Sequence, residues 1–256
     1  MFNNKENLDN DNFNTDINIK DMRLFLRDNN KECESDREKG VKMPPVQKPY
    51  DKDAEIIELV NPDKINPGNV PVNEVLRNRR SRRKYIKDAK MSLEELSYLL
   101  WYTQGIKGDN LSKRTVPSAG ARHPFETYIY LTNVEGLKKG LYRYLPVENK
   151  LCLISVDEKL EEKVSKAFYG QFPNTVVYFI WTAIPYRMEW AYTYTATRKI
   201  AIDMGYVSQN LYITSESINW GTCAIGYFNQ EELNNIVGAD GDDEITLLCS
   251  TVGKPR

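Results

Sequence analysis

Histidine is almost absent from this chain: the 256 residues contain one, His123. A metal site built from several histidines is therefore excluded, and a Ser-His-Asp or Cys-His catalytic system would have to use this residue. His123 precedes Pro124 in a stretch with a loop-like pattern. We interpret it as a polar loop residue or helix-cap partner rather than a catalytic base, and we expect no metal ion.

Cysteines are also few, and the four of them lie far apart at Cys33, Cys152, Cys223 and Cys249. They form no C-x-x-C pair, which disfavours both a disulfide framework and a zinc site. Free thiols are typical of a reducing compartment, so we expect a cytoplasmic protein. Cys223 fits a buried, inert thiol better than a redox cysteine, because no neighbour in the sequence obviously lowers its pKa.

The chain lacks long apolar runs and a strong charge excess. No run approaches the ~20 apolar residues of a membrane-spanning helix, and the N-terminus is polar rather than signal-like. The net charge is -1 and the isoelectric point is 6.1, whereas nucleic-acid-binding domains usually carry a basic excess. We therefore expect no membrane and no nucleic acid as partner. The G-x-G-x-x-G fingerprint of dinucleotide-binding folds is missing as well.

The composition divides the chain into an arm and a domain. Residues 1–40 are rich in Asn, Asp, Lys and Glu, and they cannot bury enough apolar surface to offset their ordering entropy. Within them, Ile19 to Asp28 has the pattern of a short helix. The proline-broken stretch 42–52 predicts extended chain. We expect residues 1–54 to form a polar, flexible or extended arm and residues 55–256 to form one folded domain.

Helical and strand patterns mix throughout that domain. A helix over 92–105 is marked by Ser92 as its cap, Glu95 as the reciprocal partner, and Gly105 at its end. Apolar spacing predicts further helices over 157–170, 198–218 and 229–238. Alternation and β-branched runs predict strands over 125–131, 140–154 (two strands), 175–184, 222–228 and 244–253. The mixture indicates an α+β or α/β domain.

The segment R-N-R-R-S-R-R-K-Y, residues 77–85, holds five arginines and a lysine. Such density is typical of a solvated surface, a nucleic-acid contact or a phosphate clamp. Ser81 inside the segment places a hydroxyl among guanidinium groups, and this combination suits phosphate. The segment also precedes the capped helix at Ser92, so it belongs to the folded domain. Taken alone, the pattern still fits an exposed charged patch.

Two other segments are rich in small residues. Pro117 to Ala121 precedes a predicted strand, and Ala224 to Gly226 follows the long helix. Small residues let a backbone approach a flat ligand closely, and their N–H groups can donate to its edge. A tight turn is an equally good interpretation of each segment alone. The chain ends in V-G-K-P-R, so Lys254 and Arg256 supply cations, either for a site or in a solvated tail.

In order, these segments resemble the nitroreductase superfamily of FMN-dependent oxidoreductases. The motifs are R-R-S-R-R-K-Y, P-S-A-G-A-R-H-P, D-M-G-Y-V-S-Q-N-L-Y, G-T-C-A-I-G-Y-F and V-G-K-P. The resemblance covers about residues 75–256 and is nearest to the SagB-type dehydrogenases, which are similar to oxidases that form thiazole and oxazole rings. It implies a mixed, mainly antiparallel sheet flanked by helices, and an intimate homodimer with two FMN sites between its subunits.

The resemblance also implies a cofactor site at matching positions. The basic segment would hold the FMN phosphate and ribityl chain or reach the ring. The P-S-A-G segment would lie against the isoalloxazine from the partner subunit. The A-I-G segment would run beside the ring, Gln209 would lie nearby, and the C-terminal cations would add charge at the phosphate. The implied cofactor-binding residues are Arg79, Arg80, Ser81, Arg83, Pro117, Ser118, Ala119, Gly120, Gln209, Ala224, Ile225, Gly226, Lys254 and Arg256.

The sequence departs from the ring-forming oxidases at two positions. Their W-K-Y triplet is Trp190, Ala191, Tyr192 here, and alanine cannot move a proton. A histidine that often follows Asp-x-Gly is Tyr206. Tyr192 is the candidate proton donor, with packing over the flavin or at a dimer interface as the alternative role.

Hydride transfer at the flavin N5 between NADH, NADPH or an organic substrate and an acceptor is the leading functional hypothesis. The substrate would be a small molecule or a peptide. The alternatives are a peptide azoline dehydrogenase working with a cyclodehydratase, and a non-catalytic flavin- or anion-binding protein.

Overall fold

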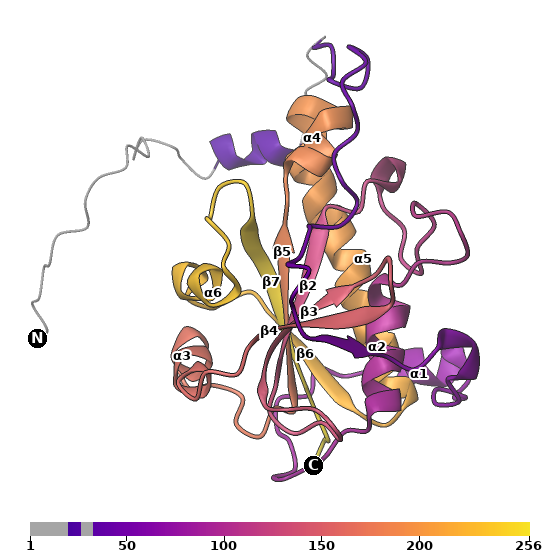
Figure 1. Cartoon of the computed structure of the whole chain (residues 1–256), viewed down its shortest axis with the longest axis vertical. Coiled ribbons are helices and arrows are strands. Elements are labelled where there is room, and N and C mark those ends of the chain that lie inside the picture. Colours follow the sequence, from indigo (N-terminus) through magenta and orange to yellow (C-terminus); the bar gives the residue numbers. More distant parts are fainter. Residues whose placement is uncertain (1–19, 27–32) are drawn as a thin grey trace, which may run out of the picture.

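The computed structural model describes residues 20–26 and 33–256. Its centre is a seven-stranded sheet in the order β1-β4-β3-β2-β5-β7-β6 (Figure 1). The strands are β1 (Ile56–Glu58), β2 (Phe125–Leu131), β3 (Gly140–Leu145), β4 (Lys150–Ser155), β5 (Val177–Ala183), β6 (Gly221–Ile225) and β7 (Ile245–Gly253). All neighbouring strands run antiparallel, and the parallel pairings in the described residues are isolated bridges, Ser81 with Thr222 and Met91 with Val134. The predicted α+β class with a mainly antiparallel sheet is confirmed.

Helices cover both faces of this sheet. They are α1 (Val72–Asn78), α2 (Leu93–Gln104), α3 (Leu160–Ala167), α4 (Tyr186–Tyr192), α5 (Ala196–Ser217) and α6 (Gln230–Val237), with short 3-10 turns η1 (Asp21–Leu26), η2 (Pro62–Lys64), η3 (Ala119–Ala121) and η4 (Thr193–Thr195). Figure 1 shows α3 and α6 on one side of the strands and α2 and α5 on the other. The expected helix at Ile19–Asp28 corresponds to η1, although residues 1–19 and 27–32 lie outside the described residues.

Two hydrophobic cores lie on opposite faces of the sheet, because side chains alternate between the faces along each strand. On β2, Ile129 packs with α2 and α5, while its neighbours Tyr128 and Tyr130 pack with α3 and α6. Successive strand residues point to opposite faces, so a strand that is apolar on both faces serves both layers. The predicted helices and strands are all present, with their ends shifted by a few residues. The predicted capping box is also confirmed, because Ser92 Oγ accepts from the Glu95 amide at 3.1 Å and Glu95 Oε2 accepts from the Ser92 amide at 2.9 Å.

Residues 33–54 run along the domain as extended chain interrupted by turns, and they pass beside α4 at the top of Figure 1. The Trp190 indole donates to the Val41 carbonyl at 2.9 Å, and the Lys48 amide donates to Glu126 Oε1 at 2.7 Å. In these two contacts the arm uses its backbone, but its polar side chains dock as well: Lys48 Nζ pairs with Glu244 at 2.5 Å, and the Tyr186 hydroxyl donates to Asp36 at 2.9 Å. The partners of these side chains are distant in sequence, so the composition of the arm did not indicate how it docks.

The loop between α2 and β2 carries His123, which is buried with 4 % of its surface exposed. A ring nitrogen lies 3.0 Å from the Ser112 carbonyl, and the His123 amide donates to Ser118 Oγ at 2.9 Å. Burial and, to a lesser extent, the nearby Arg114 lower the pKa of His123 to about 4. The residue is therefore a neutral structural element of the loop, in agreement with the loop-residue interpretation.

This burial predicts a pH-dependent stability. The unfolded chain binds a proton at His123 below pH ~6.5, whereas the folded chain resists protonation down to about pH 4. The contribution of neutral His123 to the free energy of unfolding is therefore fully present above pH ~6.5. It is lost as the pH falls toward 4, by about 2 kcal/mol between pH 7.5 and 5. Urea unfolding of the wild type and His123→Gln at both pH values measures it, with the variant lacking this component. An imidazole NMR signal titrating near pH 6.5 in the native protein would contradict the assignment.

Candidate cofactor site

The basic segment is part of the folded core and not a tail. After α1 ends at Asn78, the Arg82 amide donates to the Thr222 carbonyl of β6 at 2.9 Å, and the Ile86 amide donates to the Lys254 carbonyl at 2.8 Å. Tyr85 is 1 % exposed, and its ring lies so close to Gly253 that a Cβ there would come within 2.3 Å. Glycine at position 253 therefore lets the basic segment pack against β7.

Most cations of this segment lack an acidic partner. Arg82 pairs with Glu216 at 3.2 Å, but within residues 20–26 and 33–256 no carboxylate pairs with Arg79, Arg80 or Arg83. Arg80 donates to two nearby carbonyls, and the Arg79 guanidinium lies 5.3 Å from the centroid of the Tyr212 ring. Unpaired guanidinium groups gathered in one segment favour binding of a multiply charged anion.

The C-terminal cations lie at the same place. Arg256 Nε donates to the Tyr85 carbonyl at 3.0 Å, and Lys254 Nζ lies 5.3 Å from the Trp220 ring centroid. An isolated antiparallel bridge joins Tyr85 to Pro255. The structure therefore brings Lys254 and Arg256, 170 positions further along the chain, to the basic segment.

Tyr212 of α5 links this cluster to β6. Its hydroxyl lies 3.0 Å from Ser81 Oγ and accepts from the Ala224 amide at 2.9 Å. The buried Cys223 lies beside it, and burial raises the pKa of that thiol. The inert-thiol interpretation of Cys223 agrees with this environment. Sequence reasoning missed Tyr212, although it follows directly after Q-N-L in the D-x-G-x-x-x-Q-N-L motif.

The P-S-A-G segment is held by a buried carboxylate. The Ala119 amide donates to both oxygens of Asp203 at 3.1 and 3.2 Å, and Asp203 is 2 % exposed. Burial raises the pKa of Asp203. Gly120 has φ 54°, and a Cβ there would come within 2.4 Å of the Tyr192 hydroxyl. A side chain at position 120 is excluded on both counts. Sequence reasoning also missed Asp203, the first residue of the D-x-G motif.

Tyr192 thus lies directly against the P-S-A-G segment. Lys199 Nζ, from α5, is 4.7 Å from its ring centroid. Lys199 therefore brings a lysine to Tyr192, although position 191, where the ring-forming oxidases have lysine, is alanine here. The next residue, Thr193, has φ 43°, which is a strained conformation for a β-branched side chain. Such strain is typical of positions whose geometry serves a site.

Within one chain, the two clusters are separated. Asp203 and Tyr212 are nine residues apart on α5, which corresponds to about 2.5 turns and ~13 Å along the helix axis. They therefore lie on opposite sides of the helix. The cluster at Tyr212 contains the basic segment, Ala224 and the C-terminal cations, with Ile225 and Gly226 following along β6. The cluster at Asp203 contains Ser118, Ala119, Gly120 and Tyr192, with Pro117 exposed at its start. Gln209 is exposed on α5 between them.

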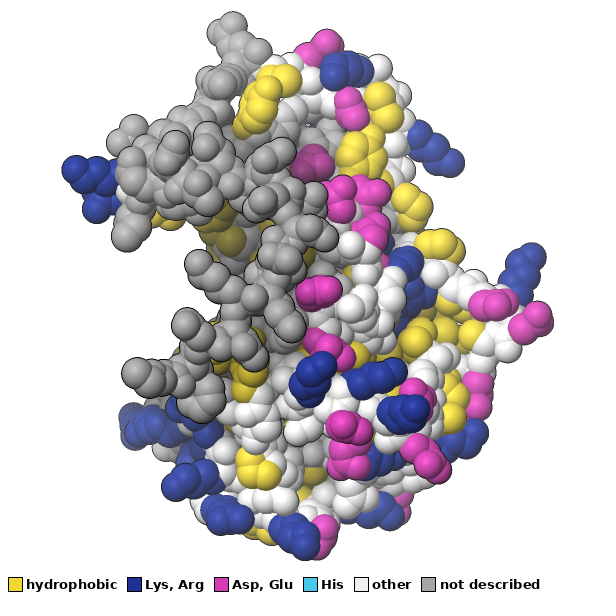
Figure 2. Space-filling view, turned by 90° about the vertical axis from the view of Figure 1, so that its left-hand side faces the viewer, with side chains coloured by type: hydrophobic (Ala, Val, Ile, Leu, Met, Phe, Trp, Pro, Cys, Tyr) yellow, Lys and Arg dark blue, Asp and Glu magenta, His cyan; other side chains and the backbone are white. Residues whose placement is uncertain are grey.

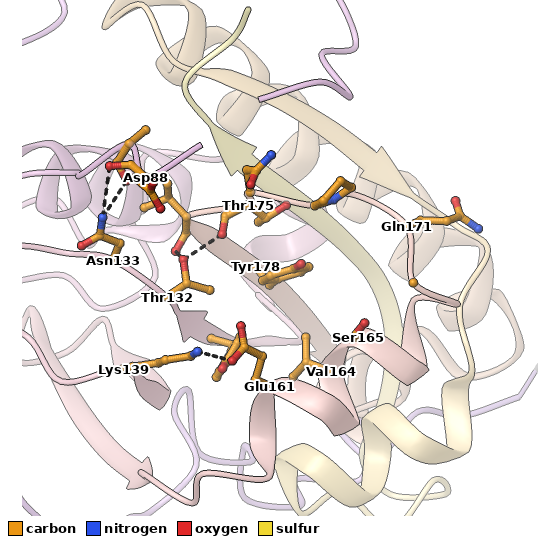
Figure 3. Close-up of a pocket in the computed structure, with 16 residues that line it drawn as sticks. Asp88, Thr132, Asn133, Lys139, Glu161, Val164, Ser165, Gln171, Thr175 and Tyr178 are labelled. Carbon is orange, nitrogen blue, oxygen red and sulfur yellow. Dashed lines mark hydrogen bonds and ion pairs between the residues drawn. The ribbon is translucent and has the colours of Figure 1, made fainter. Parts of the chain in front are cut away.

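A polar pocket of about 490 Å³ lies elsewhere, between α3 and the loop before β5 (Figure 3). Figure 3 shows Lys139 paired with Glu161 at its wall, and Thr132 donating to the Thr175 carbonyl. None of the predicted cofactor-binding residues lines this pocket. The two clusters therefore do not correspond to that cavity.

Over the described part of the face in Figure 2, basic and acidic side chains are interspersed. No group of three or more His, Cys, Asp or Glu side chains among the described residues is arranged to hold a metal ion. No helix in this part of the chain has both the length and the apolar character that a membrane crossing requires.

Comparison with known proteins identifies the family. The Nitroreductase family profile matches residues 76–254. A Methanocaldococcus jannaschii protein, provisionally named nitroreductase MJ1384, is 30% identical over 187 residues, covering 72% of this chain and 91% of that protein.

Solved structures share the fold. One, from Ralstonia eutropha and provisionally described as a nitroreductase, has a TM-score of 0.65 at 24% identity, covering 81% of this chain and 92% of that one. Another, from Desulfovibrio desulfuricans and solved in complex with FMN, has a TM-score of 0.50 at 16% identity, covering 73% and 87% of the two chains. With a profile match over most of its length and a relative of this similarity, the chain belongs to the nitroreductase family.

Proposed function

We propose that the protein is an FMN-dependent oxidoreductase that transfers hydride through the flavin N5, from NADH, NADPH or an organic substrate to an acceptor. The observation that carries this proposal is the cluster of unpaired arginines joined to Ser81 and Tyr212, inside the region that matches the family. Family membership supports an oxidoreductase, and the FMN complex of a structural neighbour supports the cofactor.

The basic segment fits a phosphate group. A phosphate dianion needs several donors, and Arg79, Arg80 and Arg83 have guanidinium groups without acidic partners among the described residues. The Ser81 hydroxyl adds a neutral donor, fixed in place by Tyr212. Lys254 and Arg256 add charge at the same end of the sheet. Phosphate would therefore be bound by groups that the fold already holds together.

The P-S-A-G segment fits a flat ring, but it faces away from the basic segment of its own chain. We propose that a homodimer brings the P-S-A-G segment of one subunit to the basic segment of the other. The surface of α5 supports this, because Ile202 and Tyr206 are 48% and 45% exposed one helical turn apart. Gly205 between them has open space around it, which allows a second helix to approach closely. Exposed apolar stripes of this kind are typical of interfaces.

When bound, the flavin supplies the hydride chemistry at N5. The chain's own residues then position the substrate and handle protons. Tyr192 can donate its hydroxyl proton to a reduced substrate, and the Lys199 ammonium is close enough to stabilise the phenolate left behind. The strained backbone at Thr193, at the end of α4, is held by the structure around it.

A reductase role fits these residues better than azoline oxidation. Ala191 has no group that can carry a proton at the position where the ring-forming oxidases have lysine, and Lys199 approaches Tyr192 from a different helix. The SagB-type branch and a cyclodehydratase partner therefore remain predictions from sequence resemblance. A non-catalytic anion binder is disfavoured by the Tyr192–Gly120 contact, which a phosphate site alone would not need.

The first test is the identity of the cofactor. The protein purified from cells is expected to be yellow, with a flavin spectrum and close to one FMN per chain after release and chromatography against FMN and FAD standards. Reduction of the bound flavin by NADH or NADPH would then be followed at the flavin absorbance. A colourless protein that also fails to bind added FMN would contradict the proposal.

The second test concerns the arginines. Arg79→Gln and Arg83→Gln each remove a charge-assisted donor, so we expect the FMN dissociation constant to rise by about tenfold or more for each. Arg77→Gln is the matched control, because Arg77 belongs to the same segment but lies within α1, ahead of the turn that carries Arg79 and Arg83. Fluorescence titration of the flavin-free proteins measures the constants. Equal weakening in all three variants would point to general electrostatics instead of a clamp.

A further inference from the structure

A second cavity lies where the N-terminal arm crosses the loop before η3. It has a volume of about 300 Å³. Met43 and Val46 of the arm and Leu111 of the loop give it apolar walls, and Arg122 and Arg187 give it charge. We call this cavity the arm pocket. It adjoins Ala121 and Arg122, directly after the P-S-A-G segment.

Arg187 lines this pocket, and one of its donors has no partner. The residue is 3 % exposed, and its Nη2 pairs with Glu126 Oε1 at 2.6 Å. Its Nη1 is buried and has no hydrogen-bond partner among the described residues. A buried guanidinium nitrogen without an acceptor is costly, so an acceptor at this position would stabilise the fold.

A second buried arginine shares the same carboxylate. Arg114 is 5 % exposed and donates to the Val46 carbonyl at 2.9 Å and to Gln104 Oε1 at 3.2 Å, but it forms no ion pair within the described residues. Burial lowers the pKa of Arg114 to about 10, while Glu126 acts in the opposite direction. Glu126 therefore pairs with Arg187 and only attracts Arg114 from a greater distance.

The surrounding network does not supply the missing negative charge. Glu244 pairs with Lys48 at 2.5 Å, and the buried Arg143 donates to arm carbonyls. Three buried arginines and Lys48 therefore meet two buried carboxylates, Glu126 and Glu244. Unbalanced buried charge is strongly destabilising unless a counterion binds.

We propose that the arm pocket binds a small organic carboxylate. Its carboxylate group would accept from the Arg122 guanidinium and lie beside the positive charge of Arg187, and its apolar body would lie against Met43, Val46 and Leu111. The apolar walls favour such a ligand over an inorganic anion, and the volume suits a single ring or a short chain. Arg122 is preoriented, because its Nε donates to the Gly120 carbonyl at 2.9 Å and its guanidinium lies 5.1 Å from the Trp190 ring centroid. Binding does not depend on the proposed flavin chemistry.

Benzoate is the probe for this proposal, measured by isothermal titration calorimetry on the full chain, with its flavin content recorded. Benzamide has the same shape without the charge, and sulfate has the charge without the apolar body. We expect benzoate to bind at least about tenfold more tightly than either. Equal binding of benzoate and benzamide, sulfate binding as tightly as benzoate, or no saturable benzoate binding would overturn the proposal.

Variants locate the binding. Met43→Trp fills the pocket from the arm without touching the buried charges, and Arg122→Gln removes a half-buried donor, so each is expected to weaken benzoate binding by about tenfold or more. Val41→Trp is the matched control, because Val41 and Met43 are both 43% exposed on the same arm but only Met43 lines the pocket. Benzoate binding unchanged in Met43→Trp would contradict the assignment. A colourless protein that still binds benzoate would remove the proposed function and leave this inference intact.

Discussion

The fixed rise and turn of one α-helix set the layout of the proposed site. Asp203 and Tyr212 belong to α5, and each holds a segment from elsewhere in the chain: Asp203 holds the Ala119 amide, and Tyr212 holds Ser81 and Ala224. Because nine residues of helix separate the two by about two and a half turns, the segments face opposite sides. We propose that a single ligand contacts both segments by lying between two chains, with the exposed Ile202 and Tyr206 of α5 as the surface for that pairing.

Much of the fold was predictable from sequence because its signals are local. The capping box at Ser92, the alternation of β2 and the apolar face of α5 each depend on spacing within a few residues, and all are present in the structure. The basic segment, the P-S-A-G segment and the C-terminal cations were also chosen from the sequence, because unusual composition marks them, and their role as a site stays a prediction. Their grouping into two separate clusters depends on long-range pairing, which no local pattern contains.

The residues that organise these clusters were missed for a physical reason. Asp203 and Tyr212 act through one carboxylate and one hydroxyl on the sides of a long helix, where acidic and aromatic residues are common. Lys199 likewise reaches Tyr192 only because α4 and α5 meet at a strained junction. The docking of the arm was equally hidden, because it depends on backbone groups and on polar side chains whose partners are distant in sequence. That docking closes the arm pocket and buries the arginines whose charge the chain does not balance.

The central claim is that each cofactor site is shared between subunits, and complementation between two defective chains tests it most directly. One chain would carry Arg79→Gln with Arg83→Gln, and the other Gly120→Val, which places a side chain against the Tyr192 hydroxyl. Each homodimer is expected to hold almost no FMN. In a heterodimer purified through two different tags, one site carries both defects and the other carries none, so the account predicts about one FMN per heterodimer. A heterodimer as empty as the homodimers would contradict it, because both halves of the site would then belong to the same chain.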